Sequence, residues 1–125
     1  MADVIVKKLD EFEATFGGAF KLVRHGLGVE SFGMQVIEMP PNVDGYPEHD
    51  HSDDGQEEVY TALEGAATLK TDDGEFELTP GTFARVPAGV KRKIVTTSKP
   101  VRLLAVGGVP GKPYEIRPGS LPQPA

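Results

Sequence analysis

The 125-residue sequence contains no cysteine. This absence excludes disulfide bonds, thiol catalysis and cysteine-ligated zinc, so a bound metal would have to be held by histidine and carboxylate side chains. Long apolar runs are absent too: no stretch approaches the about 18 apolar residues of a membrane span, and residues 1–8 lack a basic start followed by an apolar core. We therefore expect a cytoplasmic protein that has no contact with a membrane.

Positive charge is in short supply, because 13 Lys and Arg stand against 19 Asp and Glu, which gives a net charge of −6. Binding to a nucleic-acid backbone needs a basic surface that releases counterions, so nucleic acid is not an expected partner. Acidic residues crowd positions 44–58, and basic residues follow at 91–102. Most of both groups are interpreted as solvated surface, with Glu58 and Arg92 as the exceptions.

The sequence also lacks a long apolar helical pattern, whereas it contains 15 glycines and 11 prolines. Such a composition is typical of short strands joined by tight turns, as in a sandwich or barrel. The length suits one domain. We therefore expect a single all-β domain over residues 1–125, with a core over about 19–107 and an extended proline-rich arm over about 108–125.

The patterns along the chain predict one helix and several strands. Leu9, Phe12 and Phe16 recur at i, i+3 and i+7 before two glycines, which predicts a short amphipathic helix over residues 9–16. The run Asp72-Asp73-Gly74 predicts a hairpin turn. The last predicted strand is apolar on both faces and should be central in its sheet. The predicted strands cover residues 19–24, 31–39, 58–63, 66–71, 76–78, 82–86, 93–97 and 101–106.

Two histidines, His49 and His51, lie shortly before the predicted strand of Glu58. Residues i and i+2 of an extended strand project from the same face, so both imidazoles can bind one object. If the two segments pair, the carboxylate of Glu58 joins them. Two histidines and one carboxylate are the smallest set that holds Fe(II) with open coordination positions. His25, at the end of a predicted strand, is interpreted as an ordinary solvated side chain.

The segment around these three residues resembles the first motif of the cupin family: Gly, five residues, His-x-His, three or four residues, Glu, six residues, Gly. His49, His51, Glu58 and Gly65 fall on its His, His, Glu and final Gly. The spacer before Glu58 is six residues, longer than usual, and Val43 stands where the motif begins with Gly. Loop insertions are thermodynamically mild, so the longer spacer is compatible with the match.

A second segment, residues 81–91, resembles the second cupin motif: Gly, five residues, Pro-x-Gly, two residues, His, three residues, Asn. It follows that pattern residue for residue, but Arg92 stands at the metal-binding His and Thr96 at the Asn. Together the motifs resemble a small single-domain cupin of the Cupin_2 type. The resemblance implies a small antiparallel β-barrel of the jelly-roll kind, the cupin double-stranded β-helix.

The resemblance also implies a small-molecule pocket in a lumen lined by His49, His51, Glu58, Tyr60 and Arg92. Three functions stay open, because a fold alone does not determine function. One is a metal-dependent enzyme, dioxygenase- or isomerase-like, in which the first three residues hold Fe, Mn, Ni or Zn and Tyr60 or Arg92 positions the substrate. Another is a metal-free binding module with Arg92 as a clamp for an anionic ligand. The last is an inert structural network.

Arg92 has a specific electrostatic consequence. An arginine is protonated at all relevant pH values and has no lone pair for a metal, so it cannot replace the missing histidine. Its charge would instead stabilise an ionised Glu58 within about 4–6 Å. We therefore expect an ion pair between Glu58 and Arg92 inside the barrel, and weaker metal binding than in a cupin with four ligands.

Apolar residues on the expected outer surface indicate self-association. Val59 and Leu63 should face away from the lumen, and the residues Leu9, Phe12 and Phe16 also need a cover. An exposed apolar area larger than a few hundred Å² usually marks an interface. We therefore expect a homodimer.

Overall fold

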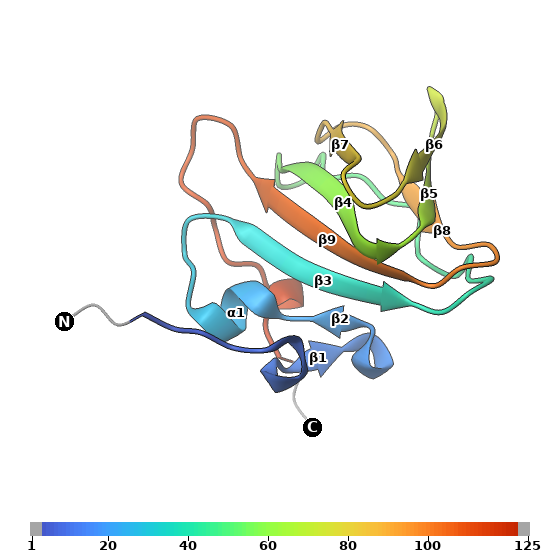
Figure 1. Cartoon of the computed structure of the whole chain (residues 1–125). Helices are drawn as coiled ribbons and strands as arrows, with labels where there is room; N and C mark the ends of the chain where they lie inside the picture. The colour runs from blue at the N-terminus through green and yellow to red at the C-terminus, as the bar shows by residue number, and fades with distance from the viewer. Residues whose placement is uncertain (1–3, 123–125) are drawn as a thin grey trace.

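The computed structural model describes residues 4–122, and most of their regular structure is β-strand (Figure 1). All strand pairs are antiparallel. Six strands form one sheet in the order β1-β2-β3-β9-β4-β7: β1 (Ala14–Thr15), β2 (Phe20–Lys21), β3 (Gly33–Met39), β4 (Glu57–Gly65), β7 (Phe83–Val86) and β9 (Val101–Gly108). Three strands form the other in the order β6-β5-β8: β5 (Ala67–Thr71), β6 (Gly74–Leu78) and β8 (Lys93–Val95).

One apolar core joins the two sheets. Across the larger sheet, Ile37 of β3 pairs with Leu103 of β9, which pairs with Ala62 of β4, and all three are at most 3% exposed. Leu69 of β5 and Ile94 of β8 belong to the same buried cluster. The all-β prediction is confirmed as a small jelly-roll barrel.

The strand β9 is central, as its apolar sequence predicted. It pairs with β3 on one side and with β4 on the other, and its odd-numbered residues from Val101 to Gly107 are buried. The hairpin prediction is also confirmed, because Thr71 pairs with Gly74 and leaves Asp72 and Asp73 as the loop. Gly74 has a φ of 134°, a conformation that favours glycine.

Gly65 ends β4 at a position where only glycine fits. Its φ is 78°, and a Cβ there would overlap the carbonyl oxygen of Pro100. The register of β4 against β9 shifts between Ala62 and Glu64, which marks a bulge just before this close approach. The final glycine of the first motif therefore serves the contact between β4 and the start of β9.

The N-terminal helix prediction is wrong. Residues 9–16 contain only the 3-10 turn η1 (Leu9–Glu11) and then β1, and the turn η2 (Phe16–Gly18) follows. An eight-residue apolar pattern gives too few turns to form a stable helix alone, so pairing at the sheet edge prevails. The α-helix among the described residues is α1 (Val23–Leu27), where the end of a strand over 19–24 was predicted. Leu22 and Val23 are buried at the start of α1, and of the predicted strand only β2 forms.

The chain after β9 contains no strand within the described residues. It carries one 3-10 turn, η3 (Pro118–Ser120), and runs back past β3 towards α1 (Figure 1). The predicted arm over 108–125 thus starts as a strand end at Gly108, and its residues 123–125 lie outside the described part. Within residues 4–122, no helix has the length and apolar character that crossing a membrane requires.

The long connection from β3 to β4 is fixed by Thr96, the residue at the Asn position of the second motif. The hydroxyl of Thr96 donates to the Pro40 carbonyl at 2.6 Å and accepts from the Val43 amide at 2.9 Å. The amide of Thr96 in turn donates to the Val43 carbonyl at 2.9 Å. These bonds hold the start of the segment that carries both site histidines.

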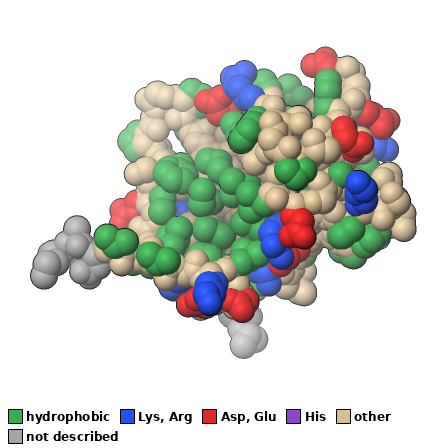
Figure 2. Space-filling view, viewed as in Figure 1, with side chains coloured by type: hydrophobic (Ala, Val, Ile, Leu, Met, Phe, Trp, Pro, Cys, Tyr) green, Lys and Arg blue, Asp and Glu red, His purple; other side chains and the backbone are tan. Residues whose placement is uncertain are grey.

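The outer face of the larger sheet carries exposed apolar side chains beside the ion pair of Arg85 and Glu57. Val59, Phe83, Leu104 and Val106 lie on it by register, and Val59 and Phe83 are 37% and 71% exposed. Leu63, in the bulge, is 50% exposed. Figure 2 shows hydrophobic side chains gathered on this face beside a group of charged ones. No described element covers the β4 and β7 part of it.

We predict that a second copy of the chain covers this outer face. Light scattering at micromolar concentration should give the mass of a dimer, and Val59→Glu should reduce it to that of a monomer because the new carboxylate would be buried at the interface. Phe76→Glu, on the edge strand β6 of the other sheet and 46% exposed in the wild type, is the control and should remain dimeric. A monomeric wild type would contradict the prediction.

Candidate metal centre

The two histidines of the first motif lie in the extended segment before β4. His49 forms a backbone bridge with Arg92: the His49 amide donates to the Arg92 carbonyl at 3.0 Å, and the Arg92 amide donates to the His49 carbonyl at 2.8 Å. The amide of His51 donates to the Ala88 carbonyl at 2.8 Å. This pairing aligns the segment with the second motif, although His49 and His51 do not lie in a full strand as predicted.

Glu58, near the start of β4, completes the predicted group. One ligand atom from each of His49, His51 and Glu58 can be chosen so that all lie within 4.8 Å of one another. The two imidazole rings are 5.2 Å apart at an angle of 77°. The structure therefore brings together two imidazoles and one carboxylate, the set that suits a divalent first-row metal.

Hydrogen bonds define which ring nitrogen each histidine offers. Nδ1 of His49 lies 3.0 Å from the Pro47 carbonyl, which only accepts, so this nitrogen is the donor and Nε2 keeps a lone pair. Nδ1 of His51 lies 3.1 Å from both carboxylate oxygens of Asp54. When Nδ1 donates to Asp54, Nε2 of His51 is likewise the lone-pair atom. Such outer partners are what orient histidines that bind metals.

Nε2 of His51 tests whether a metal fits these residues. This atom is buried and makes no aligned hydrogen bond, although it lies only 3.0 Å from Oε1 of Glu58. A buried polar atom without a partner costs free energy. A divalent ion bound between His51 and Glu58 would give this nitrogen a partner, so the donor set fits a metal.

The charge state of the group follows from its neighbours. The carboxylate of Glu58 raises the pKa of His51 against the lowering effect of burial, and Asp54 adds to the rise. Burial acts to raise the pKa of Glu58, but the adjacent imidazole of His51, the hydrogen bond from Tyr60 and the charge of Arg92 together outweigh it and lower the pKa. Burial raises the pKa of Tyr60, which stays a neutral donor. Glu58 is thus an ionised carboxylate, as metal binding requires.

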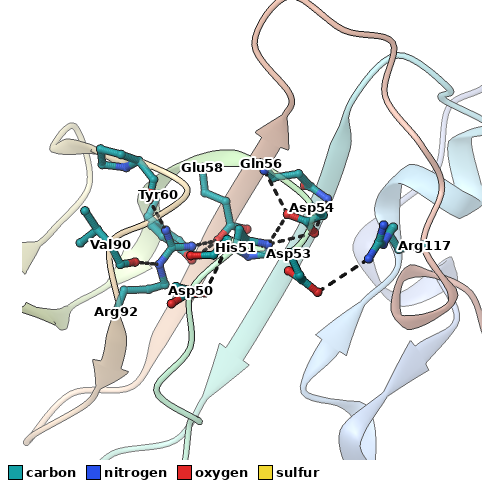
Figure 3. A network of polar contacts seen from close by, with 12 residues as sticks. Asp50, His51, Asp53, Asp54, Gln56, Glu58, Tyr60, Val90, Arg92 and Arg117 are labelled. Carbon is teal, nitrogen blue, oxygen red and sulfur yellow. Dashed lines mark hydrogen bonds and ion pairs between the residues drawn. The ribbon is translucent and has the colours of Figure 1, made fainter.

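The predicted ion pair between Glu58 and Arg92 is confirmed. Nη1 of Arg92 donates to Oε1 of Glu58 at 2.7 Å, and the hydroxyl of Tyr60 donates to the same oxygen at 2.5 Å. Nε of Arg92 donates to the Val90 carbonyl at 3.0 Å and Nη2 to the Pro87 carbonyl at 2.8 Å. Figure 3 shows Glu58, Tyr60, Val90 and Arg92 in one network with His51.

The five residues named from the sequence therefore divide into two groups. His49, His51 and Glu58 line a cavity of about 590 Å³. Tyr60 and Arg92 do not line it, because both are 0% exposed and lie behind Glu58. His25 is exposed on α1 and is not part of the site.

Several residues of the cavity were not found from the sequence. Asp54 and Gln56 hydrogen-bond to each other beside His51. Both lie in the acidic spacer between His51 and Glu58, and this position inside the first motif could have identified them. Tyr46, whose ring lies 5.6 Å from that of His49, precedes it by three residues. Arg117 comes from the arm after β9, and nothing in its local sequence points to the cavity.

Comparison with known proteins gives a consistent result. Residues 35–107, more than half of the chain, match the family model described as Cupin domain. A solved structure of a sugar phosphate isomerase from a cupin superfamily, from Silicibacter pomeroyi DSS-3, is 26% identical, with a TM-score of 0.69 over 82% of this chain and 74% of the other. No curated protein matches the chain in sequence.

Two further solved structures support the fold alone. A cupin protein from Bacteroides fragilis is 19% identical, with a TM-score of 0.70 over 94% of this chain and 93% of the other. A structure described under the DMSP lyases RdDddP and RnDddQII is 24% identical, with a TM-score of 0.57 over 70% of this chain and 45% of the other.

We predict that Arg92→Met destabilises the metal-free protein by about 3–5 kcal/mol, because it leaves the buried carboxylate of Glu58 without its cation. The free energy of unfolding in urea measures this. Arg85→Met is the matched control: Arg85 is 62% exposed and pairs with Glu57 at 2.6 Å, so its loss should cost about 0–1 kcal/mol. Equal effects of the two substitutions would contradict a stabilising role for the buried pair.

Proposed function

Because this chain belongs to the cupin domain family, we propose that it is a metal-dependent enzyme acting on a small, oxygen-bearing substrate, with the metal held by His49, His51 and Glu58. The observation that carries the proposal is the buried Nε2 of His51, which has no aligned hydrogen bond and lies 3.0 Å from Glu58. Fe, Mn, Ni and Zn all suit this donor set.

A divalent metal bound there would act as a Lewis acid on a substrate oxygen. The chain's own residues provide the conditions for that role. Asp54 and the Pro47 carbonyl orient the two imidazoles, while Tyr60 and Arg92 hold Glu58 ionised. Three protein ligands, instead of the family's four, leave more than one position for substrate atoms. Apolar residues such as Phe20, Met39 and Val43 line the cavity and limit the access of water.

Between the two enzyme classes expected from the sequence, we favour an isomerase-like reaction. The support is that the Silicibacter pomeroyi protein, 26% identical to this chain, is called a sugar phosphate isomerase. The metal-free alternative, with Arg92 as an anion clamp, has less support. Arg92 is 0% exposed and three of its nitrogens already donate to protein oxygens, so a ligand would have to break the bond to Glu58.

Metal binding is the direct test. Calorimetry with Zn(II) or Mn(II) should give about one ion per chain, and Asp54→Asn should weaken binding about 10–100-fold, as expected for an outer partner. His49→Ala and His51→Ala should weaken it at least as much, because each removes a ligand. His25→Ala, which removes the exposed histidine of α1, is the control and should have no effect. Equal losses from all histidine substitutions, or no binding by the wild type, would overturn the proposal.

Arg92→His tests the missing fourth ligand. The new imidazole would start from the backbone position that bridges His49, and the substitution also removes a positive charge close to Glu58. We expect tighter binding of Zn(II) than in the wild type, with Arg92→Met intermediate because it removes the charge without adding a ligand. Circular dichroism should first establish that both variants are folded. An unchanged affinity in folded Arg92→His would mean that Arg92 does not occupy the place of the missing ligand.

A further inference from the structure

The charges that line the 590 Å³ cavity are unevenly distributed. Among its described lining residues, Asp54 and Glu58 present carboxylates beside His51, many others are apolar, and Arg117 is the one Lys or Arg. A fixed positive charge is therefore present at a single place in a largely apolar and acidic pocket. Among the described lining residues, this arginine is therefore the one permanent cation that can attract an anion to the cavity.

Local structure fixes the backbone of Arg117 over the cavity. Arg117 precedes η3, and both the amide and the hydroxyl of Ser120 donate to its carbonyl, at 3.0 and 2.8 Å. Pro118 opens the turn, where its fixed φ is favourable. Three residues earlier, Tyr114 packs on Gly33 so closely that an added Cβ would lie 3.0 Å from the Tyr114 hydroxyl. The arm is thus anchored on both sides of Arg117.

The partner of Arg117 is weakly bound. Its Nη2 lies 3.7 Å from Oδ2 of Asp53, beyond hydrogen-bond length, and the side chains of Arg117 and Asp53 are 42% and 77% exposed. By contrast, Arg85 and Arg92 contact their carboxylates at 2.6 and 2.7 Å. An exposed pair at long distance contributes little. No other group among residues 4–122 pairs with the guanidinium of Arg117, so most of its five N–H donors are available to another anion.

We propose that Arg117 binds the anionic group of the substrate, a carboxylate or a phosphate, while the oxygen at which the reaction occurs lies at His49, His51 and Glu58. This deepens the proposed function and rests on it. Arginine binds both kinds of oxyanion through two parallel hydrogen bonds, which fixes orientation as well as charge. The incoming anion displaces Asp53, and Figure 3 shows Arg117 reaching towards that residue, next to Asp54 and His51.

Asp53 provides the sharpest test, because it competes with the substrate anion for Arg117. Inorganic phosphate and, separately, acetate are titrated into the metal-free protein while the backbone amide signals of Arg117, Gly119 and Ser120 are followed by NMR. Arg117→Gln should weaken binding about tenfold or more, and Arg117→Lys should restore part of it. Asp53→Asn should tighten binding several-fold, since it removes the competing carboxylate. If the ion pair were merely structural, substitution of either partner would not change anion affinity in opposite directions.

The pair of Arg85 and Glu57 supplies matched controls, because it lies outside this cavity. Arg85→Gln and Glu57→Gln should bind phosphate as the wild type does. Stronger binding of phosphate or of acetate identifies the kind of anion, and either supports the inference. Binding of neither, binding unchanged in Arg117→Gln, or weaker binding in Asp53→Asn would overturn it.

A parallel titration with Zn(II) separates this inference from the proposed function. Arg117→Gln should keep the metal affinity of the wild type, because Arg117 contacts none of the three metal-binding residues in any described interaction. A wild type that binds phosphate but not Zn(II) would refute only the metal-dependent function. A wild type that binds Zn(II) but neither phosphate nor acetate would refute only the role of Arg117.

Discussion

The contact between Arg92 and Glu58 connects the parts of this protein that form its site. Through its side chain, Arg92 holds Glu58 of β4 and the carbonyls of Pro87 and Val90, and through its backbone it pairs with His49. One fully buried residue thus joins the two motifs. Removing a charge from water is costly, and only a complete set of partners compensates for it. The positions of β4, of the turn before β8 and of the histidine segment therefore depend on one another.

The same contact has two opposing electrostatic effects on the site. Arg92 helps to keep Glu58 ionised, which a metal ligand needs, but its fixed charge also repels a cation at the same carboxylate. Both known hydrogen bonds to Glu58, from Arg92 and Tyr60, go to Oε1, and Oε2 accepts none from the described residues. The carboxylate is therefore shared between a structural role on one oxygen and an available ligand position on the other.

The sequence predicted the parts of the molecule in which a local pattern and the tertiary structure agree. Alternation identified β4, two-sided apolarity identified the central β9, and a turn sequence identified the β5–β6 hairpin. The spacing of His49, His51 and Glu58 predicted their grouping, and the charge of Arg92 predicted its partner. The prediction of an N-terminal helix was wrong because pairing of β1 at the sheet edge outweighed a short helical pattern. Arg117 was missed because its position depends on how the arm folds back past β3, which no local pattern encodes.

The arm after β9 contributes to the cavity wall without contributing to the sheets, which separates ligand preference from fold stability. Within the described residues, the segment after β9 adds no strand to either sheet, yet Tyr114, Arg117 and Ser120 form part of the cavity wall. These residues belong neither to a strand of either sheet nor to the shared apolar core. Ligand preference can therefore diverge among descendants of one ancestral barrel without a stability threshold being crossed, because the residues that select the ligand are not those that hold the fold together.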